Sequence, residues 1–114
     1  MSILELLEIK HPIFLALMAG VSTPELAAEV SNHGALGSLG LGANTPETAR
    51  AQILETQALT DHPFQVNFFC HRPHVLNPEK AQVWIEYLTP QFAQFNATPP
   101  TQLNCIYPSF LDND

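Results

Sequence analysis

Short apolar runs alternate along the chain with segments in which apolar residues recur at helical spacing. The apolar runs span residues 13–17, 35–39 and 64–69. These lengths are typical of strands, and continuous apolar character predicts burial on both faces of a sheet. The segments that follow predict helices over residues 24–33, 46–59 and 78–96. The order is therefore β-α-β-α-β-α.

The three predicted helices begin with one pattern, a capping residue followed by proline and glutamate: Thr23-Pro24-Glu25, Thr45-Pro46-Glu47 and Asn77-Pro78-Glu79. A threonine or asparagine oxygen accepts a hydrogen bond from a free N–H of the first turn, where proline is tolerated. Ser22 with Glu25 gives an alternative capping box for the first helix. Gly34 is expected to end that helix, and Pro90 to kink or split the third.

Alternation of this kind predicts an α/β fold with parallel strands, formed by residues 1–114 as a single domain. In parallel α/β folds ligands bind at the carboxyl ends of the strands. Residues 18–20, 40–42 and 67–70 lie at those ends. Their glycines allow a backbone to approach a ligand closely.

Composition and charge narrow the class of partner. The chain of 114 residues is 46% hydrophobic and only 13% charged, so part of its apolar surface is expected to meet a partner. The net charge of −7, with four Lys and Arg in all, argues against binding to nucleic acid or to anionic membranes. No run reaches the roughly 20 apolar residues of a membrane span, and no secretory signal is evident. We expect a cytoplasmic protein.

One polar residue in an apolar strand is a candidate ligand contact. Asn67 lies within the sequence FQVNFF, near the ligand edge. A buried amide needs a hydrogen-bonding partner, and either neighbouring backbone or a ligand satisfies that need. Gly34 to Gly42 is rich in glycine but lacks the spacing of a dinucleotide fingerprint, so tight packing is the simpler interpretation.

The histidines and cysteines suggest no metal or catalytic site. Cys70, His71 and His74 lie close in sequence, but no second ligand pair accompanies them, so no metal is expected. Adjacent residues of a strand point to opposite faces, which argues against a Cys70–His71 nucleophile. His33 is better placed to interact with the end of a helix than to catalyse a reaction. We assign no catalytic residue.

The segments HPIFLALMAGVSTPELAAEVSNHGALGSLGLG and LTDHPFQVNFF resemble the amino-terminal part of the nitronate monooxygenases, also called 2-nitropropane dioxygenases. The most specific parts are MAG with STPELA, then GALGSLG and VNFF. The resemblance implies a flavoprotein with a (β/α)₈ TIM barrel, an oxidoreductase that uses FMN to oxidise alkyl nitronates.

The resemblance also implies which residues contact the cofactor. Ala16, Leu17 and Met18 correspond to the turn whose backbone lies against the flavin, and Asn67 corresponds to a flavin-contacting asparagine. The family usually has proline where this chain has Leu17, and often glutamine where it has Leu15. Its catalytic histidine and glycine-rich phosphate site would lie beyond residue 114.

A complete barrel takes about 250 residues, so the chain is expected to supply the first three of the eight units and to be truncated. Two functions follow. The chain carries the flavin-facing strands of a complete FMN-dependent nitronate monooxygenase, or it is a non-catalytic fragment or interaction module. The second function would use the open sheet edge for self-association or for pairing with a missing carboxy-terminal part.

Overall fold

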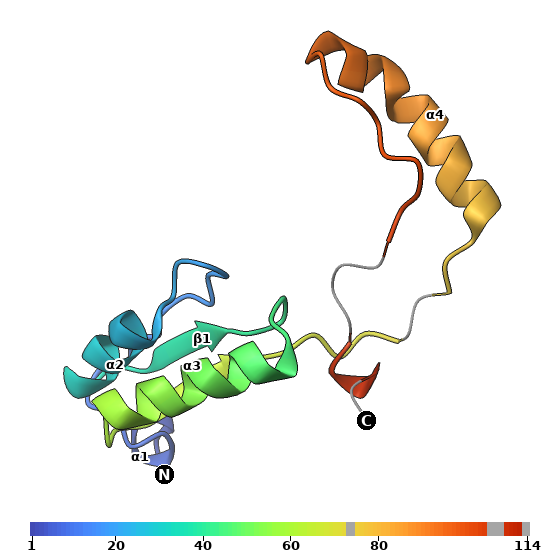
Figure 1. Cartoon of the computed structure of the whole chain (residues 1–114). Coiled ribbons are helices and arrows are strands. Elements are labelled where there is room, and N and C mark those ends of the chain that lie inside the picture. The colour runs from blue at the N-terminus through green and yellow to red at the C-terminus, as the bar shows by residue number, and fades with distance from the viewer. Residues whose placement is uncertain (73–74, 105–108, 113–114) are drawn as a thin grey trace. The chain divides into compact units, whose positions relative to one another are not determined.

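The computed structural model of the chain describes residues 1–72, 75–104 and 109–112, which divide into two compact units (Figure 1). The larger unit contains residues 1–71 and 109–112, and the smaller contains residue 72 and residues 75–104. That residues 1–114 form a single domain stays a prediction. No helix among the described residues is both long enough and apolar enough to cross a membrane.

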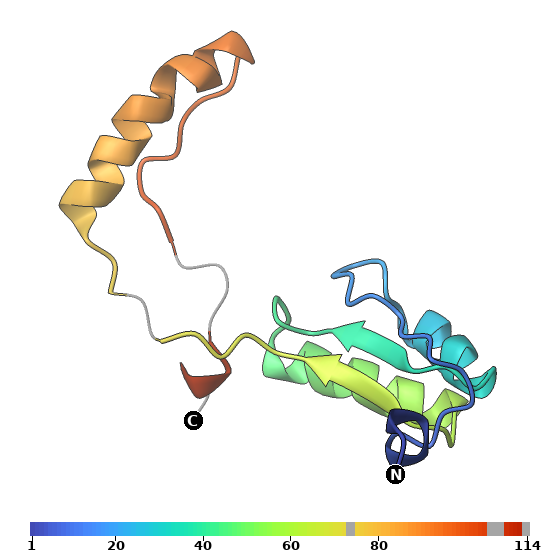
Figure 2. The ribbon, with the colours of Figure 1, turned by 180° about the vertical axis from the view of Figure 1, so that it is seen from behind.

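The larger unit is a parallel β-α-β arrangement with helices against the sheet, which confirms the α/β class. Strands β1 (Gly37–Gly40) and β2 (Phe64–Asn67) pair in parallel. Helix α2 (Pro24–Asn32) precedes β1, and α3 (Pro46–Leu59) connects β1 to β2. Figures 1 and 2, seen from opposite sides, show α3 running along one face of the sheet.

The run at residues 13–17 forms only one bridge to the sheet, in which Phe14 pairs in parallel with Leu36. The Leu15 amide donates to the Leu36 carbonyl at 2.9 Å, and the Leu36 amide donates to the Ile13 carbonyl at 2.9 Å. The prediction of burial on both faces is wrong here, because Ile13 is 60% exposed and Phe14 47% exposed. Of residues 13–17, Leu15 packs against the core, and the described residues leave Ile13 and Phe14 uncovered.

The core lies between the sheet and the two helices. Its buried centre consists of Ala27, Leu39, Leu41 and Ala49. A Cβ at Gly37 would overlap the carbonyl oxygen of Ala27, so the glycine lets α2 lie directly on β1. This contact confirms the packing interpretation of the glycine-rich segment.

The predicted helix starts are confirmed. The Thr23 Oγ1 accepts from the Leu26 amide at 3.2 Å, and the same contact recurs at Thr45 and Asn77. Thr23 is thus the cap of α2, and the alternative with Ser22 is not adopted. Gly34 follows the helix with a φ of 82°, a left-handed conformation that ends helices.

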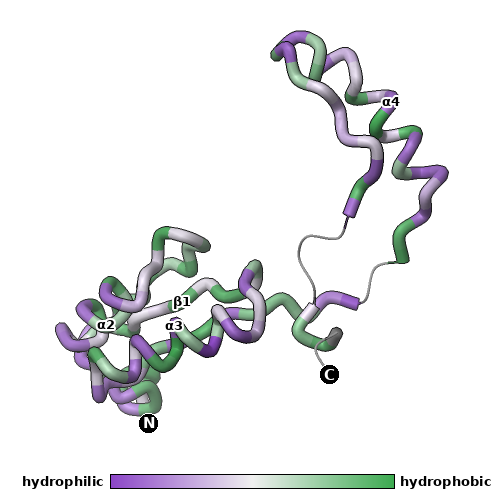
Figure 3. Tube along the Cα trace, in the orientation of Figure 1, coloured by the Kyte–Doolittle hydropathy of each residue, from purple (hydrophilic) through white to green (hydrophobic). Residues whose placement is uncertain are grey.

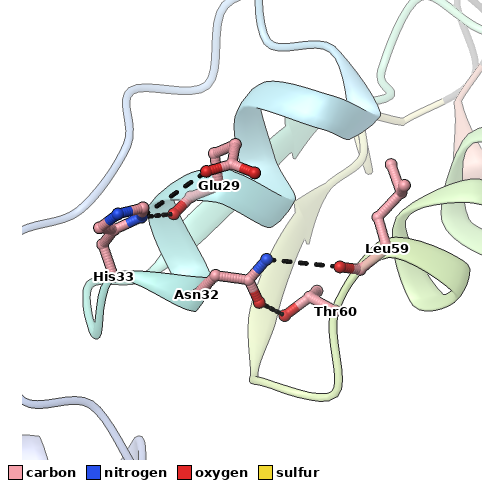
Figure 4. Close-up of polar contacts among 5 residues, drawn as sticks. All are labelled: Glu29, Asn32, His33, Leu59 and Thr60. Carbon is pink, nitrogen blue, oxygen red and sulfur yellow. Dashed lines mark hydrogen bonds and ion pairs between the residues drawn. The ribbon is translucent and has the colours of Figure 1, made fainter.

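Polar side chains join the carboxyl-terminal ends of α2 and α3 (Figure 4). The Thr60 hydroxyl donates to Asn32 Oδ1 at 2.6 Å, and Asn32 Nδ2 donates to the Leu59 carbonyl at 3.4 Å. His33 Nδ1 lies 2.8 Å from the Glu29 carbonyl oxygen and 3.7 Å from its carboxylate. The expected helix-capping role of His33 is therefore confirmed.

Two short helices were not predicted, α1 (Ile3–Leu6) and the 3₁₀ turn η1 (Phe110–Asp112). In α1 the Ser2 hydroxyl accepts from the Glu5 amide at 3.2 Å, while the Ser2 amide donates to the Glu5 carboxylate at 2.7 Å. This reciprocal pair is a capping box, and Ser2 followed three residues later by Glu5 was its sequence signal.

The smaller unit is built on α4 (Pro78–Gln94), along which polar and apolar residues alternate (Figure 3). The helix runs through Pro90, so of the two expected outcomes, a kink or a split, the split does not occur. Proline has a φ suited to a helix and removes one hydrogen bond, and α4 continues past it to Gln94. Trp84 and Tyr87 lie edge to face on this helix, with ring centroids 5.7 Å apart.

Candidate functional site

The register of the two strands places a polar row on the face of the sheet that does not carry the core. Ser38 lies opposite Gln65, and Gly40 lies opposite Asn67. Gln65 Nε2 donates to the Ser38 hydroxyl at 2.7 Å, so these two side chains share one face. Because strand side chains alternate, Gly40 and Asn67 belong to the same face. The intervening Leu39 points into the core.

The backbone of residues 17–19 lies against Gly40 at the carboxyl end of β1. A Cβ at Gly40 would lie 3.3 Å from the Ala19 nitrogen, 3.5 Å from the Leu17 carbonyl carbon and 3.6 Å from that of Met18. Asn67 is the register partner of Gly40 at the carboxyl end of β2. The structure therefore brings Leu17, Met18 and Asn67 to one edge of the sheet, with Ala16 next to them in the chain.

One buried serine holds the loop that carries these residues. The Ser22 hydroxyl accepts from the Met18 amide at 3.1 Å and donates to the Ala16 carbonyl at 2.8 Å. The Met18 carbonyl accepts from the amides of Val21 at 3.0 Å and Ser22 at 2.8 Å. Both backbone groups of Met18 and the carbonyl of Ala16 thus have partners within the chain.

The Leu17 peptide and the Asn67 amide are among the polar groups at this edge that have no partner in the described residues. Among the described residues, neither the N–H nor the C=O of Leu17 is hydrogen bonded, and the half-buried Asn67 side chain has no hydrogen bond. The Asn67 main-chain carbonyl is engaged, because the Leu41 amide donates to it at 3.0 Å. The sequence left two possible partners for the Asn67 side chain, neighbouring backbone or a ligand. In the described part of the chain, no backbone group bonds to this side chain.

An apolar pocket of about 510 Å³ lies between the strand ends and α3. Leu41, Ile53, Phe68 and Phe110 are among its lining residues. Asn44 also lines it, and its Nδ2 is buried without a hydrogen-bonding partner in the described structure. None of Ala16, Leu17, Met18 and Asn67 lines this pocket, so it is distinct from the edge described above.

The candidate metal ligands do not form a cluster in the described residues. Cys70 and His71 are exposed, and no group of three or more histidine, cysteine or acidic side chains in the described ranges is arranged to hold a metal ion. His74 and Cys105 lie outside the described residues.

One carboxyl group near the loop has a shifted pKa. A hydrogen bond from the Glu25 backbone amide, and a weaker effect from the Thr23 hydroxyl, lower the pKa of Glu25 below its usual value. The negative charge is favoured because Glu25 lies in the first turn of α2, where free N–H groups point towards it. The lowered pKa is consistent with the observed start of α2. It does not make Glu25 a candidate acid or base for catalysis.

Sequence reasoning missed Ser22 and Gln65 as parts of this edge. Gln65 and Asn67 are two residues apart in a strand, and that spacing was a usable signal for one shared polar face. Ser22 gave no comparable signal, because its partners are set by how the loop folds back and its spacing to Glu25 suggested a helix cap.

A family model described as nitronate monooxygenase matches residues 2–107 of the chain. The chain is 54% identical over 110 residues to the nitronate monooxygenase of Paraburkholderia phytofirmans, covering 96% of this chain and 30% of that protein. It is 52% identical over 108 residues to the nitronate monooxygenase of Pseudomonas aeruginosa, covering 95% of this chain and 31% of that protein. The chain thus spans under a third of the length of these curated relatives.

Two solved structures are similar in fold. A nitroalkane oxidase from Streptomyces ansochromogenes superposes with a TM-score of 0.68 at 35% identity, covering 84% of this chain and 27% of that one. FabK from Thermotoga maritima superposes with a TM-score of 0.58 at 38% identity, covering 78% of this chain and 27% of that one.

Proposed function

Because the chain belongs to the nitronate monooxygenase family, we propose that it carries the flavin-facing strands of an FMN-dependent enzyme that oxidises alkyl nitronates. The segments at 13–17, β1 and β2 are proposed as the first three strands of a (β/α)₈ barrel. The proposal assigns the cofactor to the carboxyl edge of the strands, where ligands of parallel α/β folds bind.

The observation that carries the proposal is that the Leu17 peptide and Asn67 both adjoin Gly40, from opposite sides, at the carboxyl ends of the strands. The reactive ring of a flavin presents hydrogen-bond acceptors and an N–H donor along one side. A free peptide N–H and C=O, together with a carboxamide that both donates and accepts, are suited to that side. Gly40 leaves the backbone of residues 17–19 close to β1, and Asn67 on β2 is the register partner of Gly40.

The proposed contacts are divided among the four candidate residues. Asn67 binds the flavin through its side chain and Leu17 binds it through its peptide. Ala16 and Met18 shape the loop, because the Ala16 carbonyl and both Met18 groups already bond to Val21 and Ser22. FMN, when bound, supplies the redox chemistry by accepting electrons from the nitronate. The chain's own residues bind and orient, and none is assigned a catalytic role.

An FMN titration of the purified chain tests the proposal, with quenching of flavin fluorescence as the signal. Saturable binding is expected, and Asn67→Ala should weaken it about three- to tenfold, the loss expected for one hydrogen bond. Asn32→Ala is the matched control, since it removes the same carboxamide between α2 and α3. A folded chain that binds no FMN contradicts the proposal.

An interaction module is the second candidate, supported by the sheet. Among the described residues β2 pairs with β1 alone, and Val66 on β2 is exposed. An unpaired edge is a template for another strand. Sedimentation of the purified chain tests this function. A colourless, stable oligomer that does not bind FMN would favour the interaction module, and a monomer that binds FMN would exclude it.

A cytoplasmic location stays a prediction.

A further inference from the structure

Ser22 is buried and its hydroxyl closes a loop that ends at the proposed flavin edge. The residue is 7% exposed. One oxygen accepts from the Met18 amide and donates to the Ala16 carbonyl, so it bridges the two residues on either side of Leu17. The position of the Leu17 peptide therefore depends on the Ser22 hydroxyl.

The helix that follows does not need this hydroxyl. Thr23 caps α2, and its Oγ1 accepts from the Leu26 amide. The turn before Ser22 is closed by its own backbone, since the Val21 amide donates to the Met18 carbonyl and Gly20 has a φ of 75°. Glycine in the left-handed region at this place is typical of a type II turn. No backbone hydrogen bond of the described residues connects this turn to Ala16, and the Ser22 hydroxyl provides that connection.

We propose that Ser22 is a positioning residue for flavin binding, whose hydroxyl holds residues 16–18 so that the free Leu17 peptide faces the cofactor beside Gly40 and Asn67. This inference rests on the proposed function. Removing the hydroxyl takes away the side-chain partners of the Ala16 carbonyl and the Met18 amide. Those groups then compete with Leu17 for new partners, and the loop loses its fixed geometry at the edge.

Ser31 provides a matched control, because its hydroxyl has the same pair of bonds elsewhere. It accepts from the Gly37 amide at 3.1 Å and donates to the Pro63 carbonyl at 2.8 Å. Ser31 is also buried, at 1% exposure, but its partners lie at the amino ends of β1 and β2. Ser22→Ala and Ser31→Ala therefore remove equivalent bonds at opposite ends of the sheet.

The test combines FMN affinity with amide hydrogen exchange in the whole chain. Ser22→Ala should raise the FMN dissociation constant about tenfold and speed exchange of the Met18 amide by at least tenfold. Ser31→Ala should leave FMN affinity within about twofold and speed exchange at Gly37 instead. Ser22→Thr, which keeps a hydroxyl, should recover most of the affinity.

Amide hydrogen exchange of the wild-type chain is a second test, and it does not require the variants to fold. Its Met18 amide should be protected before FMN is added, whereas the Leu17 amide should become protected only on adding FMN. Rapid exchange of the Met18 amide in the free chain overturns the inference. Wild-type affinity in Ser22→Ala overturns it while leaving the proposed function standing. Absence of FMN binding to the wild-type chain overturns both.

Discussion

Gly40 lies opposite Asn67 across the β1–β2 pair, and the missing side chain of Gly40 lets the backbone of residues 17–19 approach the sheet. The closest approach to a Cβ at Gly40 would be 3.3 Å, to the Ala19 nitrogen. This relationship links the first strand segment to the third, although their residues are about fifty positions apart in the chain. Leu17 and Asn67 thus lie on either side of Gly40, at the carboxyl ends of the strands.

Gly40 is therefore expected to control the edge through the size of its side chain. Gly40→Ala requires the loop to shift by a few tenths of an ångström, and Gly40→Val requires more. FMN affinity should fall in the order glycine, alanine, valine, with overpacking costing about 1–3 kcal/mol of stability for the larger residue. Flavin fluorescence titration measures the affinities and urea unfolding measures the stabilities. Equal FMN affinity in all three proteins would contradict the proposed edge.

Gly37→Ala should destabilise the fold more than Gly40→Ala does. A Cβ at Gly37 meets the carbonyl of Ala27 and the Ser31 hydroxyl, and the backbone of a packed helix yields less readily than a loop. We expect a loss of about 1–3 kcal/mol or more, since extra atoms in a packed interior force the backbone apart. Urea unfolding followed by circular dichroism measures the change. Matching midpoints for the two alanine variants would show that α2 does not lie on β1 as described.

Leu39→Ala should remove a large part of the stability of the larger unit. Leu39 is 0% exposed in the core, and truncating a buried leucine costs about 2–5 kcal/mol. Leu6→Ala is the control, because Leu6 is 62% exposed in α1 and its replacement should change stability by about 0.5 kcal/mol or less. Thermal unfolding of both variants provides the comparison, and similar shifts would contradict the assigned core.

Glu25 should make stability depend on pH in the acid range. Its folded pKa is lowered from an ordinary value of 4.5, so the carboxylate stabilises the folded chain above pH 4.5. That contribution is lost as the pH falls from 4.5 through the folded pKa. The stability difference between the wild type and Glu25→Gln should therefore be constant above pH 4.5 and shrink below it. Urea unfolding across this range measures it, and a difference that grows on acidification would contradict the helix-start contact.

Much of the fold follows from local signals in the sequence. The Thr-Pro-Glu pattern located α2 and α3 because capping depends on residues within one turn. Burial of the segment at residues 13–17 did not follow, because an apolar run does not reveal whether a second layer covers it. Phe14 is exposed because no second layer of the described residues covers it. Of the two outcomes expected at Pro90, the split did not occur, because a proline inside a helix is a cost in stability rather than an exclusion.

The candidate site was predictable in part. Asn67 stood out as a polar residue in an apolar strand, and the resemblance to a family indicated residues 16–18. The role of Ser22 was not predictable, because its hydroxyl bonds to Ala16 and Met18 arise from the path of the loop. Gly40 stood out only as one glycine among several, until the structure placed the loop against it.

The most direct test of the central claim is an FMN titration of isotope-labelled chain followed by nuclear magnetic resonance. The account predicts saturable shifts of the Asn67 side-chain amide and the Leu17 backbone amide, with the Asn32 side-chain amide unchanged at the far end of the sheet. Shifts confined to the residues around the apolar pocket, such as Asn44, or no shifts in a folded chain, would contradict it.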